Sequence, residues 1–388
     1  MILNIVPDEK FLPFLQGLFE EAAPGENLWR VFTDKPKSAF AVKAEGMEII
    51  NDEYYASEKF KNDLLLSDCV IFHSQFLSSR KKLVVLSRIP KHMPIIWRGW
   101  GFDYYPILQV DGLRLFMPET SSLMKGPNET INEHIGRHPI KILKGIFYKK
   151  ARQAISNRFI ARINYFSCCV PDDFESLKRV MPTFKAQFLP LNYYSAEDIF
   201  LRGVGLQNLT GHDILLRNSS NPTNNHIEAM RALSKLGMYG RKVIVPLNYG
   251  DMSYQKKIIR AGKDILGKSF YPLTDYMPLP EYNQLISGCG NLIMNHIRQQ
   301  AIGNISSALL RGGKVFLRSE NPIYKYYTRM GVKLFPFSDA ITIEDLDVSL
   351  NQNEVIKNKE IMLGMWSRVQ GIKNVKTIAL LGKQGQPE

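Results

Sequence analysis

The chain has 388 residues, 45% of them hydrophobic, and a formal net charge of +13 at pH 7. This length exceeds what one hydrophobic core usually supports, so we expect two domains, and the composition excludes a disordered or fibrous protein. The positive charge favours anionic partners such as nucleotide diphosphates, nucleic acids or anionic lipids. The four cysteines form no C-x-x-C pair, which argues against a zinc or redox site and favours a cytoplasmic protein with reduced thiols.

The first residues, MILNIVPDEKFLPFL, have no basic region before an apolar run and no small-residue cleavage site. We therefore expect a first strand here and not a secretory signal. No segment reaches the roughly 18 to 20 apolar residues that a membrane-spanning helix needs. Any membrane contact is expected to be peripheral.

The first half alternates short apolar runs with longer mixed segments. This order predicts a parallel sheet with crossover helices. Functional residues of such sheets lie at the carboxyl ends of the strands, where His73 and the segment 97–103 fall. The expected strands are 1–6, 67–76 and 94–103, and the expected helices are 51–65 and 76–89.

A basic segment at 138–165 is expected to form one or two amphipathic helices. Apolar residues such as Ile140 and Leu143 are spaced for one face, and lysines and arginines fill the remainder. Such a segment fits docking on an anionic membrane, and a domain-packing helix with its basic side in solvent is the alternative. The domain junction is expected in the polar stretch 190–212.

The second half repeats the alternation and predicts a second α/β unit, again with loops at strand ends. A polar, helix-rich tail is expected from 343 to 388. The expected strands with their loops are 213–220, 242–250, 291–300 and 314–322, and the expected helices are 225–237, 254–267, 279–289 and 302–313.

The first polar turn of the second half joins a strand to a helix that begins near Asn224. Backbone amides at a helix start, together with hydroxyl side chains, form a binding site for phosphate. The same residue types are ordinary caps and turn formers, so a purely structural turn is equally supported. Capping does not require a histidine in the first turn of the helix, so His226 favours a binding role. The candidate donor-binding residues in this turn are Asn218, Ser219, Asn224 and His226.

The segment NHIRQQAIG ends a strand and precedes a helix start at Gly303. Arg298 is suited to neutralise a diphosphate that leaves as charge builds up in the transition state, and the amides near Gly303 add dipoles. Gln299 and Gln300 complete this candidate set. A solvated loop is the alternative, because polar loops before helices are common in α/β domains.

Glu320 and Asn321 follow the next strand. The carboxylate of Glu320 is placed to accept hydrogen bonds from a ribose or sugar hydroxyl. The alternative is a helix cap with Pro322 at the first helical position.

In the first half, two tryptophans and a carboxylate occur at one strand end. Trp97 and Trp100 offer aromatic faces that pack on sugar rings, and Asp103 is suited to take the proton of an attacking hydroxyl. His73 is the rival general base. The alternative for the two tryptophans and Asp103 is an aromatic corner of the core, with Asp103 as a helix cap. The alternative for His73 is a structural histidine whose hydrogen bonds are satisfied.

No strong metal site is expected. The triplet Asp345-Leu346-Asp347 lies near the polar tail and fits a solvated acidic patch or a helix start. The chain also has no Walker loop, no dinucleotide-binding glycine motif, and no zinc-protease or serine-hydrolase motif.

Taken together and in order, these segments resemble the TDP-N-acetylfucosamine:lipid II N-acetylfucosaminyltransferases, the enterobacterial common antigen enzymes of glycosyltransferase family fifty-six. The likeness is best from about 212 to 335. The matching residues there are Asn218, Ser219, Thr223, Asn224, His226, Val245, Pro246, Tyr249, Arg298, Gln299, Gln300, Ile302, Gly303, Glu320, Asn321 and Pro322. The thinner match in the first half comprises Phe72, His73, Gln75, Phe76, Trp100, Gly101 and Asp103.

The resemblance implies an α/β protein of the GT-B glycosyltransferase fold, with two Rossmann-like domains facing across a cleft. It implies a donor sugar on TDP or UDP, resembling 4-acetamido-4,6-dideoxy-galactose or another hexose, no obligatory metal, and a polyprenyl-diphosphate-linked glycan as acceptor. Arg217, Ser220 and Asn221 depart from the family's pattern where the donor should bind, so the donor is open. The implied catalytic candidates are Asp103, His73 and Arg298, the donor-binding set gains Tyr249, and the acceptor side comprises Gln75, Trp97 and Trp100.

We expect an acceptor-binding domain over 1–200, a donor-binding domain over 201–365, and a final helix over 366–388 that crosses back to the first domain. The expected location is the cytoplasmic face of the bacterial inner membrane, in O-antigen, common-antigen or capsule synthesis. Two rivals are a non-enzymatic polyanion-binding protein and a GT-B nucleotide-sugar epimerase. No nucleic-acid partner is expected, because the basic cluster at 138–165 has no known nucleic-acid-binding module.

Overall fold

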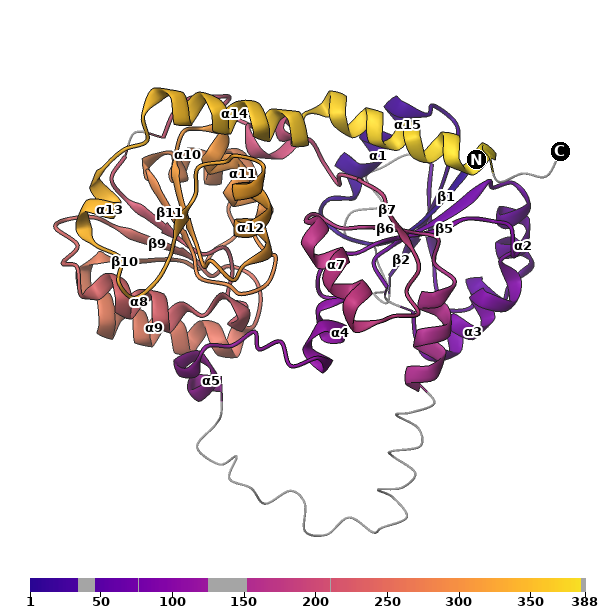
Figure 1. Cartoon of the computed structure of the whole chain (residues 1–388), viewed down its shortest axis with the longest axis horizontal. Helices are drawn as coiled ribbons and strands as arrows, with labels where there is room; N and C mark the ends of the chain where they lie inside the picture. Colours follow the sequence, from indigo (N-terminus) through magenta and orange to yellow (C-terminus); the bar gives the residue numbers. More distant parts are fainter. Residues whose placement is uncertain (34–45, 76, 125–151, 210, 385–388) are drawn as a thin grey trace, which may run out of the picture. The chain divides into compact units, whose positions relative to one another are not determined.

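The computed structural model describes residues 1–33, 46–75, 77–124, 152–209 and 211–384. The chain divides into two compact units, each built on its own parallel sheet (Figure 1). Unit 1 comprises Met1–Asp111, Thr130–Tyr194 and Arg368–Glu388, and unit 2 comprises Gly112–Glu129 and Ser195–Ser367. The chain therefore passes from one unit to the other more than once.

In the described residues of unit 1, seven parallel strands form a sheet in the order β3-β2-β1-β4-β5-β6-β7. The chain runs outward from β1 to β3, returns to β4 beside β1, and then continues outward to β7. The strand order therefore reverses between β1 and β4. The strands are β1 (Ile2–Pro7), β2 (Asn27–Phe32), β3 (Met47–Ile50), β4 (Cys69–His73), β5 (Ile95–Arg98), β6 (Tyr165–Ser167) and β7 (Gln187–Phe188).

The core of unit 1 joins its first and last helices. Leu15 and Phe19 of α1 pack with Val375 and Ile378 of α15 in one buried cluster. The C-terminal helix is thereby part of unit 1, although unit 2 precedes it in the chain. The unit 1 helices are α1 (Leu12–Ala22), α2 (Glu58–Leu65), α3 (Ser79–Arg88), α4 (Tyr105–Val110), residues 152–161, α7 (Pro171–Val180) and α15 (Arg368–Gln384).

In the described residues of unit 2, six parallel strands form a sheet in the order β10-β9-β8-β11-β12-β13, so the strand order reverses between β8 and β11. The strands are β8 (Ile214–Leu216), β9 (Val243–Pro246), β10 (Phe270–Leu273), β11 (Asn291–Met294), β12 (Lys314–Leu317) and β13 (Phe335–Pro336). The helices are α5 (Pro118–Met124), α8 (His226–Ser234), α9 (Met252–Leu266), α10 (Leu279–Leu285), α11 (Ile302–Leu310), α12 (Pro322–Arg329), α13 (Ile343–Asp347) and α14 (Gln352–Trp366).

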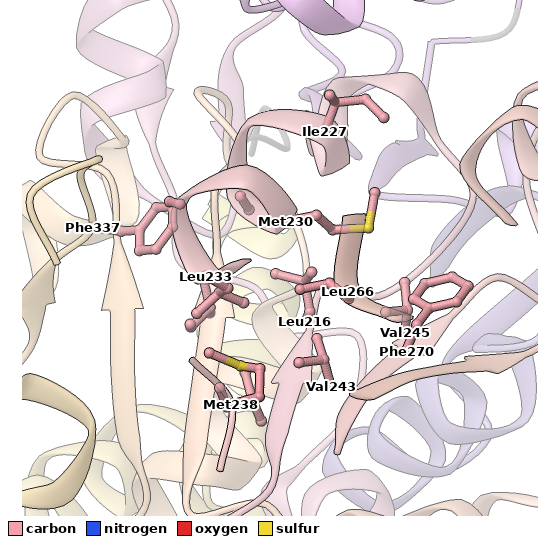
Figure 2. Close-up of a cluster of buried hydrophobic side chains, with 14 of the residues drawn as sticks. Leu216, Ile227, Met230, Leu233, Met238, Val243, Val245, Leu266, Phe270 and Phe337 are labelled. Carbon is pink, nitrogen blue, oxygen red and sulfur yellow. The ribbon is translucent and has the colours of Figure 1, made fainter. Parts of the chain in front are cut away.

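The core of unit 2 lies between its sheet and the helices α8 and α9. Figure 2 shows Met230 and Leu233 of α8 facing Leu216 of β8 and Val243 of β9, and all four side chains are fully buried. Burying a side chain of this size stabilises a fold by about 1.5 to 3 kcal/mol. Helices α8 and α9 pack side by side, and α11 packs on α14 (Figure 1).

Several described elements fall outside the expected strands and helices. Helix α1 and strands β2 and β3 fall between the first two expected strands, and β10 falls between two expected helices. In β2 the apolar run is interrupted by Arg30, whose charge is paired inside the unit with Asp63 at 2.6 Å. In β10 it is interrupted by Pro272, which an edge strand tolerates.

The basic segment 138–165 is described only from residue 152 onward, and residues 138–151 lie outside the described part. Residues 152–161 are helical, and Phe159 and Ile160 are buried in unit 1. The ring of Phe159 contacts that of Phe72 on β4. This portion therefore packs against its own unit. Within the described residues, no helix combines the length and apolar content that crossing a membrane requires.

Candidate functional site

Two loops meet at the carboxyl edge of the unit 2 sheet, where the strand order reverses. Strands β8 and β11 are direct neighbours, and the loops after them are 217–225 and 295–301. Ligands of open α/β sheets bind at this position. The residues before α8 and α11, Asn225 and Ala301, have left-handed backbones, and neither side chain caps its helix. Both helix starts are therefore suited to bind an anion.

Gln300 links the two loops through its side-chain amide. Its Oε1 accepts a hydrogen bond from Thr223 Oγ1 at 2.8 Å, and its Nε2 donates to Asn218 Oδ1 at 3.0 Å and Asn224 Oδ1 at 3.1 Å. Arg298 Nε donates to Thr223 Oγ1 at 3.2 Å. Because Thr223, Asn224 and Gln300 are buried, the network fixes Arg298 beside the two helix starts.

The remaining candidates of the first loop lie next to this network. Asn224 Nδ2 donates to the backbone oxygen of Ser219 at 2.8 Å. Asn218 Nδ2 donates to the hydroxyl of Tyr249 at 3.0 Å, and Tyr249 as a residue is 46% exposed. The structure therefore brings Asn218, Ser219, Asn224 and Tyr249 together at one edge.

Two candidates of the second loop lie beside Arg298 or begin the following helix. Gln299 is buried next to Arg298, and Gly303 is the second residue of α11. Asn321 donates from Nδ2 to the backbone oxygen of Arg298 at 3.0 Å, and its Oδ1 caps α12. Asn321 therefore caps α12, as in the structural alternative in which Pro322 begins this helix. It also binds the loop that carries Arg298.

Glu320 lies in the loop between β12 and α12, with its side chain 54% exposed. Partial burial acts to raise its pKa, but a hydrogen bond from Arg318 at 2.9 Å, the charge of Arg318 and further hydrogen bonds together outweigh burial and lower the pKa below its usual value. The carboxylate is therefore ionised near neutral pH and can accept hydrogen bonds from hydroxyl groups.

His226, the first residue of α8, is fully buried. Its Nδ1 lies 3.1 Å from the hydroxyl of Tyr254. Burial, and secondarily the charge of Arg217, lowers the pKa of His226 well below its usual value, so the imidazole is neutral. His226 is thus part of the wall behind the helix start.

Residues that precede the basic segment also contact the region around the start of α8, which their sequence did not indicate. Helix α5 packs on α8, where Thr120 donates from its backbone nitrogen and its hydroxyl to the two oxygens of Glu228, at 2.8 and 2.7 Å. The backbone nitrogen of Met117 donates to Asn225 Oδ1 at 2.8 Å. The contacts of Asn225 and Glu228 join residues more than 100 positions apart, and no local pattern signals them.

In unit 1, His73 lies at the end of β4, where the strand order reverses. It is fully buried, with Nε2 3.0 Å from Asn4 Oδ1 and its ring stacked on Trp29. Burial, with a smaller effect of Arg98, lowers its pKa to about 3. This environment matches the structural alternative for His73, and its role as a base stays a prediction.

Asp103 joins the loops that follow β4 and β5. Its Oδ2 accepts from the backbone nitrogen of Gln75 and from Trp97 Nε1, both at 2.8 Å, and its Oδ1 accepts from the backbone nitrogen of Trp100 at 2.9 Å. Burial raises the pKa of Asp103, and these hydrogen bonds oppose the rise. Trp97 is 1% exposed and packs edge-on against Phe166, so it belongs to the core.

The three acceptor-side candidates, Gln75, Trp97 and Trp100, are therefore connected through the catalytic candidate Asp103. Trp100 packs edge-on against Tyr193, with ring centroids 5.0 Å apart. The role of Asp103 as general base stays a prediction, as does sugar stacking on Trp100. Both oxygens of Asp103 already accept hydrogen bonds, which an anchoring role also explains.

The acidic triplet at 345–347 forms part of the short helix α13. Asp345 completes a capping box with Thr342, and Asp347 pairs with Arg241. Of the two interpretations of the triplet, the helix start is correct. In the described ranges, no group of three or more histidine, cysteine, aspartate or glutamate side chains is arranged to hold a metal ion.

Several solved structures share the fold of the whole chain. HepE from Anabaena, solved with UDP and glucose, is 12% identical with a TM-score of 0.56, and the match covers 100% of both chains. WaaG, a glycosyltransferase involved in lipopolysaccharide biosynthesis, is 12% identical with a TM-score of 0.51, and the match covers 98% of this chain and 95% of WaaG. AviGT4, a glycosyltransferase of avilamycin A biosynthesis, is 9% identical with a TM-score of 0.54, covering 99% and 97%. These likenesses confirm the GT-B fold, with its two Rossmann-like units.

The sequence itself matches a family model. The model is described as 4-alpha-L-fucosyltransferase, glycosyl transferase group 56, and it covers residues 155–379, which is more than half of the chain. This match contains the whole of the edge formed by 217–225 and 295–301, and it confirms the resemblance stated from the motifs. The chain belongs to glycosyl transferase group 56, the 4-alpha-L-fucosyltransferase family, and is a nucleotide-sugar-dependent glycosyltransferase.

Proposed function

We propose that unit 2 binds the nucleoside diphosphate of the donor sugar between the loops 217–225 and 295–301. The observation that carries this proposal is the convergence of two helix starts on Arg298, which Gln300 and Thr223 hold in place. Helix amides and a guanidinium together stabilise the negative charge that develops on a leaving diphosphate. HepE, which has the same fold, was solved with UDP and glucose, and this supports a donor in this class.

Two further residues near this diphosphate site, Glu320 and Tyr249, are proposed to contact the donor. The ionised carboxylate of Glu320 serves the hydroxyls of the ribose or the sugar, and Tyr249 offers an exposed ring at the end of β9. We propose TDP or UDP as the nucleotide and no metal cofactor. A sugar resembling 4-acetamido-4,6-dideoxy-galactose is supported by the family's description as fucosyltransferases, because fucose is a 6-deoxy-galactose.

Unit 1 is proposed to bind the acceptor, a polyprenyl-diphosphate-linked glycan in surface polysaccharide synthesis. The carboxyl edge of its sheet carries Trp100 and Asp103, which suit a sugar ring and its hydroxyl. The proposed location is the cytoplasmic face of the inner membrane, with peripheral docking through 138–165. The proposed domain roles therefore follow the division into two units.

Thermal unfolding with TDP, UDP and GDP tests the donor. A ligand at 100 times its dissociation constant adds about 2.7 kcal/mol of stability, and we expect TDP or UDP to give this shift. Transfer of a labelled sugar to a polyprenyl-diphosphate glycan then tests the acceptor. If no nucleotide shifts the unfolding temperature, the donor site is refuted. Hydrolysis without transfer would refute the lipid-linked acceptor.

Sedimentation with anionic vesicles tests the membrane role. Replacing Lys144, Lys149, Lys150 and Arg158 by glutamine should weaken binding, because each basic residue near an anionic surface contributes about 1 kcal/mol. The matched control removes four exposed charges around α9, at Lys256, Arg260, Lys263 and Lys268. Equal binding by both variants, or no binding by the unmodified protein, would refute docking through 138–165.

A further inference from the structure

Arg217 is the first residue after β8, at the reversal of strand order in unit 2. Its side chain is 0% exposed, and its φ is 75°, a left-handed conformation that residues other than glycine adopt at an energetic cost. A buried arginine therefore occupies a strained backbone position in the loop that begins the proposed donor site.

The buried guanidinium of Arg217 is incompletely paired. Nη2 donates to the backbone oxygen of Asn225 at 3.1 Å, whereas Nε and Nη1 have no hydrogen-bond partner among the residues that the structure describes. Glu228 acts on Arg217 through space, but both of its oxygens accept hydrogen bonds from Thr120. Burial lowers the pKa of Arg217 well below its usual value, and Tyr254 and Glu228 offset this only in part.

The acidic residue in the first turn of α8, Glu228, does not bind the guanidinium of Arg217, because its two oxygens accept hydrogen bonds from Thr120. Asn225, which accepts its hydrogen bond, is the residue directly before α8, so the guanidinium lies at this N-terminus. His226 and His296 are fully buried, each has an Nε2 atom without a partner in the described ranges, and the charge of Arg217 helps to lower both pKa values. A buried charge in such surroundings destabilises a fold unless an anion binds to it.

We infer that Arg217 is a further donor-binding residue, whose buried charge acts with the start of α8 to hold the diphosphate of the nucleotide sugar. This inference rests on the proposed donor site in unit 2. The starts of α8 and α11 have no side-chain cap, so both favour binding of an anion. Arg217 adds a full positive charge that no carboxylate binds directly. Strained backbone positions and incompletely paired residues cluster at ligand-binding sites, which supports this role for Arg217.

The test uses the full chain with Arg217→Met, which keeps most of the side-chain volume and removes the charge. Calorimetry with UDP and TDP should show affinity about 10-fold to 100-fold lower, while uridine and thymidine bind within about twofold of the unmodified protein. The unfolding temperature should stay equal or rise. Arg217→Lys keeps a charge and should retain more diphosphate affinity than Arg217→Met.

Arg311 provides the matched control, because it is 1% exposed in the same unit and all three of its guanidinium nitrogens donate hydrogen bonds. Arg311→Met should lower the unfolding temperature and leave UDP and TDP affinity unchanged. Diphosphate affinity that is intact in Arg217→Met, or lost equally in Arg311→Met, overturns the inference. If the unmodified protein binds neither UDP nor TDP, the proposed donor site fails instead.

Discussion

Replacing Asp103 by asparagine separates an anchoring role from a role as general base. The carboxylate accepts three hydrogen bonds, two at Oδ2 and one at Oδ1. Asparagine has one oxygen, so in its best orientation it keeps the bonds from Gln75 and Trp97 and turns its NH2 group toward the backbone nitrogen of Trp100. One bond is lost, two donors then face each other, and the bonds that remain lose their charge.

The expected cost follows from these contacts. A hydrogen bond to a charged group contributes about 1.5 to 3 kcal/mol, so the loss of one bond and the weakening of two should destabilise unit 1 by about 2 to 4 kcal/mol. For a unit of this size that lowers the unfolding temperature by roughly 4 to 16 °C. Asp111→Asn is the control, because Asp111 is exposed at the end of α4 and should change stability by less than about 0.5 kcal/mol.

Thermal unfolding and transfer rates of both variants decide between the two roles. If Asp103 is only a base, Asp103→Asn should lower the rate about 100-fold to 10,000-fold with an unchanged unfolding temperature. If it anchors the loops, stability falls and the nucleotide affinity of unit 2 stays the same. An unfolding temperature equal to that of Asp111→Asn would refute the anchoring argument.

Three further predictions concern the donor loops and the buried histidines. Arg298→Ala should lower transfer about 30-fold to 1000-fold, or 2 to 4 kcal/mol in the barrier, without unfolding the protein, and a rate within about twofold of normal would remove Arg298 from the mechanism. Gln300→Leu breaks three hydrogen bonds and should cost about 2 to 3 kcal/mol in urea unfolding together with nucleotide affinity; unchanged affinity would show that the network does not position the donor. Burial, aided by Arg98 for His73 and by Arg217 for His296, lowers both pKa values to about 3, below the unfolded value of about 6.5, so stability is complete above about pH 6.5 and is lost as the pH falls toward 3. Thermal unfolding at about pH 7.5, 6 and 5 checks this, and a constant unfolding temperature would contradict it.

The donor edge was predictable because its signal is local. Each loop there follows a short apolar run and precedes a helix, so Asn218, Arg298 and Glu320 were placed at strand ends from their neighbours alone. Parallel pairing then puts the ends of β8, β11 and β12 at one edge. The family motifs fall on the same residues.

The parts that were missed depend on distant contacts. Arg30 is compatible with a buried strand only because Asp63 pairs with it from another element. Thr120 and Glu228 are separated by 108 positions, so nothing near either residue in the chain signals that α5 belongs to unit 2. The partial pairing of Arg217 likewise depends on what surrounds it after folding.

The return of α15 to unit 1 has a consequence for the synthesis of the protein. The ribosome delivers the described strands of unit 1 first, but the α1 surface that packs with Val375 and Ile378 stays exposed until the last part of the chain emerges. Unit 2 is synthesised between these two events, and each of its described strands precedes α15 in the chain. The N-terminal unit is therefore expected to complete its folding after the unit that follows it, and nascent chains stalled before residue 368 should remain sensitive to protease at α1.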